Sequence, residues 1–440
     1  MTMIDLGEVT HEQSGPAVPL DHRRLLRALL ALLTAAGVLA VGGSAPGARP
    51  GLRPLWIAPF AMERDAVALD RGTAYVARTG DDIGARPTVA AYDLDTGAMR
   101  WSAPTGTRLA GFTHRPACDI VLAPVDPITF IHNEENGDRY FYIAIQTTIA
   151  LDAATGHELW RVDGDARPSV PTGTALVADH DKQNHVVGLR AIRLRDGAEL
   201  WRLALPPLAG WTPLPSFDHP EAIATVTANG TVAVYGFAGG ELRRTGRLPG
   251  AGPGVVTSIE PAGPNFAVSR DVAEGGATTT VYDSGTFEAL WLADYVAACG
   301  ALTCSSSSDG LSARDPSTGR VVWNLPAIHD GWQVGADRML VGADRTNNRL
   351  RLVDSRTGKL LGRPITGLAA AVSGEAGSVL VTRPSRDPLG QLVVTRVDLA
   401  DGRQTPLGRF GPSGDQAVCL SSPGYLACPR YDGLHVMGVG

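Results

Sequence analysis

The chain has 440 residues, a formal charge of −6 at pH 7 and only 19% charged residues, so it can form several small domains or one large repetitive domain. The mildly acidic balance, without any long basic block, argues against nucleic-acid binding, which needs a concentrated cationic face to neutralise phosphates. The 52 glycines and 31 prolines predict frequent turns.

The first segments of the chain predict a membrane anchor. Residues 1–24 are polar and rich in turn-forming residues, which predicts a disordered cytoplasmic tail. Residues 25–43 are apolar apart from Arg27, and their length is close to the roughly 20 residues of a membrane-spanning helix. Arg23, Arg24 and Arg27 place the N-terminus in the cytoplasm. We therefore expect a single-pass signal anchor in the plasma membrane, with the remainder of the chain outside.

Two other interpretations of residues 25–43 stay open. A cleaved signal peptide would need a small-residue cleavage site, and the best one, at residues 43–45, is followed by Pro46, a poor first residue for a mature chain. A buried core helix fits poorly with the linker of residues 44–54, which is rich in proline and glycine. We expect one large domain over residues 55–440.

A ten-residue phrase recurs through this domain, with the skeleton Asp, three residues, Gly, three residues, Trp. It reads YDLDTGAMRW at 92–101, LDAATGHELW at 151–160 and RDPSTGRVVW at 314–323. Successive copies in the chain are 32 to 59 residues apart, most of them near 40, which is the usual length of a propeller blade. Five further copies are IRLRDGAELW (192–201), YDSGTFEALW (282–291, with Phe287 in the glycine place), and the weaker VDSRTGKLLG (353–362), VDLADGRQTP (397–406) and YGFAGGELRR (235–244).

The chemistry of the phrase predicts a β-hairpin. Apolar runs before each Asp predict strands, Asp can accept hydrogen bonds from turn N–H groups, and Gly supplies the positive φ of a tight hairpin. The following strand brings Trp to a place where we expect it to pack between neighbouring sheets. We assign this structural role to Asp93, Gly97, Trp101, Asp152, Gly156, Trp160, Gly197, Trp201, Asp283, Trp291, Asp315, Gly319, Trp323, Asp354, Gly358, Asp398 and Gly402.

Short β-rich runs precede each phrase, and no convincing amphipathic helix follows the anchor, so the domain is predicted to be all-β. Radial repetition protects strand edges, and we predict a β-propeller of about eight four-stranded blades, with seven and nine as alternatives. A β-sandwich would not need eight copies of one hairpin. Residues 55–60 (LWIAPF) are expected to complete a blade made by the C-terminal strands. Counting that blade separately gives nine, but we expect one degenerate phrase not to form a blade.

Five cysteines follow the anchor. Cys299 and Cys304, and likewise Cys419 and Cys428, flank tight turns, and the spacing predicts two disulfides. Cys118 has no evident partner. A metal site of four cysteines is disfavoured because the chain contains no Cys-x-x-Cys.

The phrases resemble the ALDxxTGxxxW repeat of PQQ-like (quinoprotein-type) β-propellers, over roughly residues 55–440 and most strongly at 152–160 and 315–323. An anchor followed by such a propeller resembles membrane-anchored actinobacterial proteins of the PQQ-binding-like type. The resemblance implies about eight blades. Quinoprotein dehydrogenases of this type also carry a Cys-Cys dipeptide and Glu, Asn and Asp ligands for Ca²⁺; no Cys-Cys dipeptide occurs here, so we expect neither PQQ nor Ca²⁺ to be bound.

Two polar loops carry residue types that can ligate a metal ion: Asp179, His180, Asp181 and His185 in one, and residues 132–138 (HNEENGD) in the other. We interpret both as solvated loops, and we expect no catalytic, cofactor-binding or metal-binding residue. The resulting hypothesis is a non-catalytic, extracytoplasmic scaffold that binds an envelope protein or a small envelope ligand. The alternative is a quinoprotein-like oxidoreductase or another enzyme that uses the central channel.

Overall fold

The computed structural model describes residues 51–440 apart from residues 81–85, 113–115, 117, 134–138, 250–254, 273–275, 308, 343–347, 373–376 and 412–417. The predicted tail and anchor, and the linker up to residue 50, lie outside the described residues. Within the described ranges, no helix is long and apolar enough to cross a membrane. These ranges contain 36 strands, and residues 50–440 form one compact unit.

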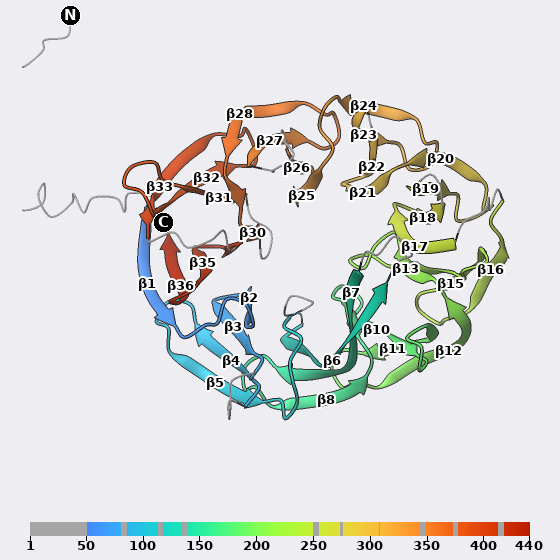
Figure 1. Cartoon of the computed structure of the whole chain (residues 1–440), viewed down its shortest axis with the longest axis horizontal. Coiled ribbons are helices and arrows are strands. Elements are labelled where there is room, and N and C mark those ends of the chain that lie inside the picture. Colours follow the sequence, from blue (N-terminus) through green and yellow to red (C-terminus); the bar gives the residue numbers. More distant parts are fainter. Residues whose placement is uncertain are drawn as a thin grey trace, which may run out of the picture. The chain divides into compact units, whose positions relative to one another are not determined.

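The strands form nine sheets, which follow one another around a ring (Figure 1). We number these sheets as blades 1 to 9. Blade 1 consists of β2 (Ala66–Asp70), β3 (Thr73–Arg78), β4 (Thr88–Asp93) and β5 (Met99–Pro104). Blade 2 consists of β6 (Ile120–Asn133), β7 (Arg139–Asp152) and β8 (Glu158–Asp163). Blade 3 consists of β9 (Ala166–Ser169), β10 (Thr174–His180), β11 (Val186–Arg193) and β12 (Glu199–Leu208).

The next three blades continue the same pattern. Blade 4 consists of β13 (Gly210–Leu214), β14 (Ala222–Val226), β15 (Thr231–Gly236) and β16 (Leu242–Arg247). Blade 5 consists of β17 (Val255–Ala262), β18 (Asn265–Val272), β19 (Gly276–Tyr282) and β20 (Ala289–Ala293). Blade 6 consists of β21 (Tyr295–Cys299), β22 (Leu302–Ser307), β23 (Gly310–Arg314) and β24 (Val321–Leu325).

The last three blades complete the ring. Blade 7 consists of β25 (Gly331–Gly335), β26 (Arg338–Gly342), β27 (Arg349–Asp354) and β28 (Leu360–Thr366). Blade 8 consists of β29 (Leu368–Ala369), β31 (Ser378–Pro384), β32 (Leu392–Asp398) and β33 (Gln404–Phe410). Blade 9 consists of β1 (Leu52–Ala58), β36 (Gly433–Val439), β35 (Tyr425–Arg430), β34 (Leu420–Ser422) and β30 (Ala371–Val372).

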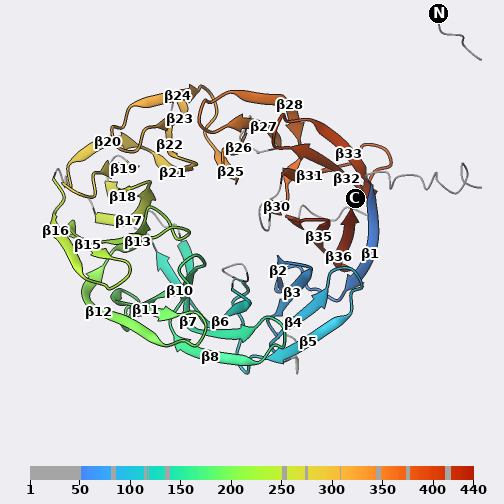
Figure 2. The same ribbon diagram turned by 180° about the vertical axis from the view of Figure 1, so that it is seen from behind.

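The ring closes through blade 9, where the first strand of the described chain joins the last ones. β1 pairs antiparallel with β36, from Leu52 opposite Val439 to Ala58 opposite Leu434. β1 is the outermost strand of its sheet, and it continues the rim formed by β5, β8, β12, β16, β20, β24, β28 and β33 (Figures 1 and 2). Residues 55–60 therefore contribute to the blade that the sequence predicted for them.

The prediction of about eight four-stranded blades is wrong, because the ring has nine. The weak phrase at residues 235–244 forms the β15–β16 hairpin of blade 4, and the phrase at 397–406 forms the β32–β33 hairpin of blade 8. A hairpin needs only a residue that accepts positive φ, and Gly240 (φ +70°) meets this need without the Asp or the Trp. Blade 2 has three strands and blade 9 has five.

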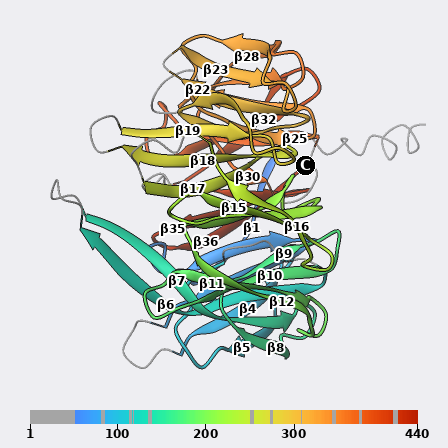
Figure 3. The same ribbon diagram turned by 90° about the vertical axis from the view of Figure 1, so that its right-hand side faces the viewer.

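Blade 2 differs from the others by a long hairpin. β6 and β7 have 14 residues each and pair along their length, from Ile120 opposite Asp152 to Asn133 opposite Arg139. Figure 3 shows this hairpin leaving the body of the ring. Leu109 forms an isolated bridge with Val125 in place of a first strand. This hairpin accounts for the longest spacing between two copies of the phrase.

The core lies between neighbouring blades, because both faces of the middle strands are covered. All five residues of β14 are buried, as are the first five of β3. Each sheet is therefore apolar on both sides, unlike a sheet that alternates buried and exposed residues. One apolar cluster, for example, joins Leu69 and Val76 of blade 1 to Leu434 and Val436 of blade 9.

Candidate functional site

The recurring hairpins lie on one face of the ring, which we call the hairpin face. Strands alternate in direction within a blade, so the turns after the first and the third strands reach the same face. Backbone hydrogen bonds join these two turns: Leu94 N–H donates to Gly72 O (3.0 Å), and Leu194 N–H donates to Gly173 O (2.9 Å). The turns of a blade thus form one connected surface.

The Asp of the phrase organises its own turn. In blade 1, Asp93 Oδ1 accepts hydrogen bonds from Asp95 N (3.1 Å), Thr96 N (2.9 Å) and Thr96 Oγ1 (2.9 Å). The same Thr contacts recur at Asp152, Asp283, Asp315 and Asp354. The hydrogen bonds from Thr155 hold the pKa of Asp152 below its usual range. The Asp398 carboxylate accepts a hydrogen bond from the backbone N–H of Ala400 (2.8 Å). These carboxylates serve the turns.

The Trp of each phrase contacts the hairpin of the next blade. Trp160 Nε1 donates to Leu194 O (2.7 Å), the carbonyl that follows the Asp position of blade 3. Its ring covers Gly197, where a Cβ would lie 2.8 Å from Trp160 Cγ. The phrase glycines therefore provide room for an indole as well as positive φ. Equivalent hydrogen bonds join Trp101 to Ala153 (3.0 Å), Trp201 to Phe237 (3.0 Å) and Trp323 to Ser355 (2.8 Å).

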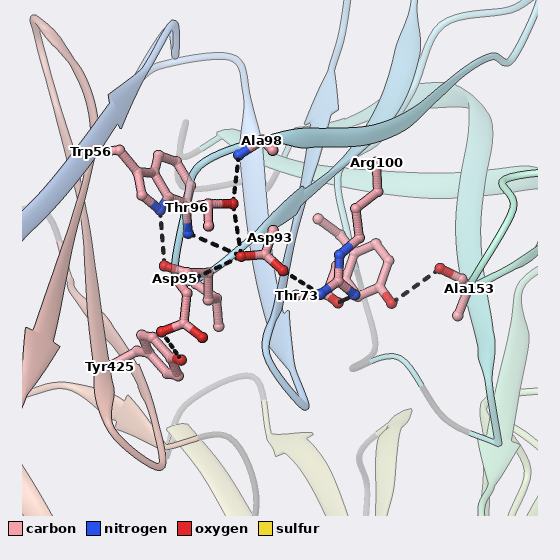
Figure 4. Close-up of polar contacts among 11 residues, drawn as sticks. Trp56, Thr73, Asp93, Asp95, Thr96, Ala98, Arg100, Ala153 and Tyr425 are labelled. Atoms are coloured by element: carbon pink, nitrogen blue, oxygen red, sulfur yellow. Dashed lines mark hydrogen bonds and ion pairs between the residues drawn. The ribbon is translucent and has the colours of Figure 1, made fainter.

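The same contact closes the ring between blades 9 and 1 (Figure 4). Trp56 of β1 donates from Nε1 to Leu94 O (2.9 Å), and Gly97 lies under its ring. Tyr425 of β35 donates to Asp95 Oδ1 (2.6 Å), a bond that raises the pKa of the tyrosine. Trp56 was absent from the residues assigned from the sequence because its strand carries no phrase. Its position in LWIAPF, the strand that completes a blade, could have identified it.

Arg100 completes the blade 1 hairpin on the other side of Asp93 (Figure 4). Its guanidinium donates to Asp93 Oδ2 (2.6 Å) and to Thr73 Oγ1 (2.8 Å). The hydrogen bond from Arg100, together with those from Thr96, lowers the pKa of Asp93 to about 2. This carboxylate is therefore ionised at neutral pH and fully used by the hairpin.

The phrase departs from its pattern in two consecutive blades. In blade 4, Arg244 stands four residues after Gly240, where blades 1, 2, 3, 5 and 6 have Trp. In blade 5, Phe287 (φ +64°) stands where other blades have Gly. Its ring is buried and lies 6.2 Å from that of Phe266. No indole from blade 4 covers position 287, which explains why a large side chain fits there.

Two neighbouring pockets open on the hairpin face of blade 4, and Glu221 and Arg243 line both. The first has a volume of about 500 Å³ and lies between blades 4 and 5. We call it the slot pocket and define it by Leu214, Pro215, Val234, Arg244, Pro264 and Ser284. The second, of about 550 Å³, lies between blades 3 and 4 and is lined by Thr172, Thr174, Trp201 and Phe237. Their volumes are typical of ligand-binding clefts.

The sequence did not single out this region. The available signal was the pair of aligned departures, Trp to Arg at 244 and Gly to Phe at 287, in the copies at 235–244 and 282–291. Each copy read alone indicates only a degenerate repeat. The structure places both changes at one blade interface, where the Phe287 ring lies beside Gly246, two residues after Arg244 on β16: a Cβ on Gly246 would lie 2.9 Å from Phe287 Cδ2.

A family model described as outer membrane protein assembly factor BamB matches the chain at residues 48–207 and 88–250. Over these residues the chain resembles the PQQ-like β-propeller family. No curated protein matches its sequence significantly. The crystal structure of the computationally designed Ika8 protein is 13% identical and matches 89% of this chain and 100% of the other, with a TM-score of 0.42.

Two further solved structures are similar to this chain. BamB from Moraxella catarrhalis is 12% identical, with 88% of this chain and 100% of the other covered and a TM-score of 0.40. A chain of the mitotic checkpoint complex is 12% identical, with 61% and 84% covered and a TM-score of 0.33.

The candidate metal residues of this propeller form ordinary ion pairs and turns. Asp179 contacts Arg190 (2.9 Å) and Arg202 (3.3 Å), whereas Asp181 pairs with Nδ1 of His185 (3.1 Å) in the β10–β11 turn. Across the described ranges, no group of three or more His, Cys, Asp or Glu side chains is placed to hold a metal ion. Of the second loop, residues 134–138 lie outside the described residues.

The structure joins Cys299 to Cys304, with Cα atoms 5.4 Å apart, and Cys419 to Cys428, with Cα atoms 4.3 Å apart. The first pair bridges the β21–β22 turn, and the second connects the residue before β34 to β35. All four cysteines are buried. Cys118 is a free, exposed thiol.

Proposed function

We propose that this PQQ-like propeller is a non-catalytic scaffold that binds a protein partner on the hairpin face of blades 4 and 5. The slot pocket carries this proposal, because it opens on the hairpin face between blades 4 and 5 and combines apolar walls with the guanidinium of Arg244. Blades 7 and 8 also lack the Trp and carry Gly362 and Pro406 in its place. In blade 7 the backbones of Gly362 and Gly402 meet directly: a Cβ on Gly402 would lie 2.9 Å from the Gly362 Cα.

Two further observations support a binding role. The family model that matches is described as an assembly factor, a description that favours contact with other proteins. The repeated carboxylates are engaged in their own turns, as the hydrogen bonds at Asp93 and Asp152 show. A rigid ring with accessible turns suits a scaffold, since binding residues commonly lie on loops held by a stable framework.

We further propose that residues 25–43 hold the chain in the plasma membrane, with the N-terminus in the cytoplasm and the propeller outside. The arginines at 23, 24 and 27 support this orientation. The disulfides Cys299–Cys304 and Cys419–Cys428 suit an oxidising compartment. Protease added to intact spheroplasts should digest the propeller of the full chain. Protection equal to that of a cytoplasmic marker would contradict this orientation.

The second candidate is an enzyme that uses the central part of the ring. The innermost strands of blades 3, 4 and 5 carry Arg167, Trp211 and Glu260, and the Arg167 guanidinium lies 5.4 Å from the centre of the Trp211 ring. Burial raises the pKa of Glu260, as is common at catalytic sites. Addition of PQQ and Ca²⁺ to the full chain, followed by absorbance of bound quinone after gel filtration, tests this candidate.

Site-specific photocrosslinking tests the scaffold. We would place a benzophenone amino acid at Ala238, an exposed residue of the blade 4 hairpin, in the full chain in its native host. The matched control is Ala228, an exposed alanine in the β14–β15 turn on the opposite face. The scaffold requires a discrete crosslinked protein from position 238 and none of the same size from position 228. Identical products from both positions, or none from position 238, would contradict it.

A further inference from the structure

The long β6–β7 hairpin of blade 2 continues beyond the part of the blade that has a third strand. β8 pairs with β7 only over residues 147–151, and the isolated bridge on the other side of the hairpin lies at Val125. Seven further residue pairs follow, between residues 127–133 and residues 139–145. We call these seven pairs the ribbon. At about 3.3 Å per residue the ribbon is about 20 Å long, and Figure 3 shows it extending from the ring.

The ribbon is apolar in sequence on both of its faces. Its strands read PITFIHN and RYFYIAI, in which Arg139 is the only Asp, Glu, Lys or Arg residue. Successive residues of a strand lie on opposite faces, and residues directly opposite each other share a face. One face therefore includes Ile128, Phe130, Tyr140 and Tyr142, and the other includes Ile131, Phe141, Ile143 and Ile145. Ile128 is 45% exposed. A lone two-stranded ribbon is marginally stable in water, and this composition is typical of an interaction surface.

β7 has a free backbone edge along the ribbon. In the sheet order β6, β7, β8, the strand β6 pairs with one edge of β7 and β8 with the other. Beyond residue 147, no described strand pairs with this second edge, so backbone N–H and C=O groups of residues 139–146 are available to another strand. β8 is a rim strand, and the edge therefore faces outward from the ring. Charged residues and proline commonly protect such edges, but residues 140–146 (YFYIAIQ) contain neither.

The ribbon and the start of the described chain lie on opposite faces of the ring. Gly440 N–H donates to Gly51 O (3.1 Å), beside the pair formed by Leu52 and Val439. β36 and β1 take the third and outermost places in blade 9, and in the other blades these two strands are joined on the hairpin face. The β6–β7 turn lies at the other end of β7 from the phrase at 151–160, so the ribbon extends from the opposite face (Figure 3).

This geometry excludes two occupants of the ribbon. The linker of residues 44–50 spans at most about 25 Å, whereas β1 and the ribbon together extend about 40 Å from Gly51. With the anchor proposed above, neither the anchor nor its bilayer reaches the outer part of the ribbon. Lipid also supplies no hydrogen-bond partners for a free strand edge, and open sheet edges do not occur in the hydrocarbon region. A strand of another protein satisfies both the free edge and the apolar faces.

We infer that the ribbon binds an apolar β-strand of a partner protein, which adds to the free edge of β7 at residues 139–146. Main-chain hydrogen bonds hold the added strand, and apolar residues on both faces of the ribbon provide its neighbours. The ribbon is then a second binding surface of the scaffold, separate from the slot pocket. Exclusion of the membrane as the occupant rests on the proposed anchoring.

Hydrogen exchange with mass spectrometry on the full chain in detergent tests strand addition. The probe is a capped peptide with the sequence of residues 127–133 (PITFIHN), because β6 already pairs with β7 through these residues. The matched control is the same peptide with every backbone nitrogen methylated, which cannot donate to a strand edge. We expect the probe to slow exchange in residues 139–146 about tenfold and the control to change it by less than about twofold. No slowing with the probe, or equal slowing with both peptides, would overturn the inference.

Photocrosslinking in the native host tests the kind of occupant. A benzophenone amino acid at Ile128 should give a discrete crosslinked protein, and Ala228, an exposed alanine on the same face of the ring, should not. Ile143→Lys places a charge on the β7 edge and should reduce the product about fivefold or more, whereas Thr129→Lys, directly opposite on β6, should leave it within about twofold. A product with twice the mass of the chain, crosslinked lipid alone, or equal effects of the two lysines would overturn the inference.

The ribbon and the earlier proposals fail separately. A crosslinked protein from Ala238 without one from Ile128 would overturn the ribbon and leave the hairpin-face scaffold intact. A product from Ile128 that Ile143→Lys removes, without any product from Ala238, would overturn the hairpin-face site and support the ribbon. Protection of the propeller in spheroplasts would overturn the proposed orientation, and the peptide experiment would still decide whether β7 accepts a strand.

Discussion

Replacement of Trp160 by Ala tests the contact that joins one blade to the next. The side chain is 8% exposed, covers Gly197 and donates to Leu194 O (2.7 Å). Loss of a buried Trp costs about 3–5 kcal/mol. Unfolding entropy near 2.1 cal/mol/K per residue predicts roughly 1 °C per kcal/mol for a domain of this size, so the thermal midpoint should fall by about 3–6 °C. Circular dichroism on the full chain in detergent measures the shift.

Two further variants separate the causes of this loss. Trp160→Phe keeps a ring over Gly197 but removes the N–H donor, and it should cost about 1–3 kcal/mol because Leu194 O loses its partner. Trp291→Ala is the matched control: this indole is half-buried and its Nε1 has no partner among the described residues. Its loss should be smaller than that of Trp160. A midpoint for Trp160→Ala within 1 °C of the unmodified chain, or a larger loss for Trp291→Ala, would refute the reasoning.

Two variants test the hairpins, and mass spectrometry tests the disulfides. Gly156→Val should lower the thermal midpoint more than Gly424→Val. Both glycines have positive φ, but only at Gly156 would a Cβ meet an indole, 2.5 Å from Trp101 Cε3. Equal shifts of the midpoint would show that backbone strain alone, and not the indole, requires glycine at position 156. The pKa of Asp93 is about 2 in the folded state, below the ordinary 3.8. The folded state therefore binds fewer protons than the unfolded state. The contribution of Asp93 to the free energy of unfolding is present above pH 4 and is lost as the pH falls toward 2. The stability difference between the unmodified chain and Asp93→Asn should therefore shrink from about 1 kcal/mol after solvent screening to near zero between pH 5 and pH 2; a constant difference would contradict this. Non-reducing peptide mass spectrometry should find Cys299 linked to Cys304 and Cys419 to Cys428, and recovery of these four cysteines as free thiols would contradict the structure.

Local chemistry explains what could be predicted from the sequence. The Asp that accepts hydrogen bonds from turn N–H groups and the Gly at positive φ act within ten residues of each other. The hairpins at 92–101 and 151–160 could therefore be predicted from the sequence. The strands before them follow from apolar runs. The ring-closing role of residues 55–60 could also be predicted, because the three C-terminal strands needed a fourth strand to complete a blade.

The blade count could not be obtained in the same way. It depends on whether a weak phrase such as 235–244 still forms a hairpin, and Gly240 alone was sufficient for that. Sheet pairing then follows from neighbours that lie far along the chain, as with β1 and β36. The number of blades depends on how the sheets pack side by side around the ring. A single copy of the phrase does not indicate that number.

The sequence by itself determined an all-β ring of repeated hairpins, because turn chemistry and strand patterning act over short distances. Only the tertiary structure decided that each repeat Trp covers the glycine of the following blade and that most of them donate to a carbonyl there, as Trp101 does with Gly156 and Ala153. The same packing gave Arg244 and Phe287 a shared interface and left the slot pocket between their blades. The physical reason is that an interface belongs to two sheets at once, so its space depends on side chains from both.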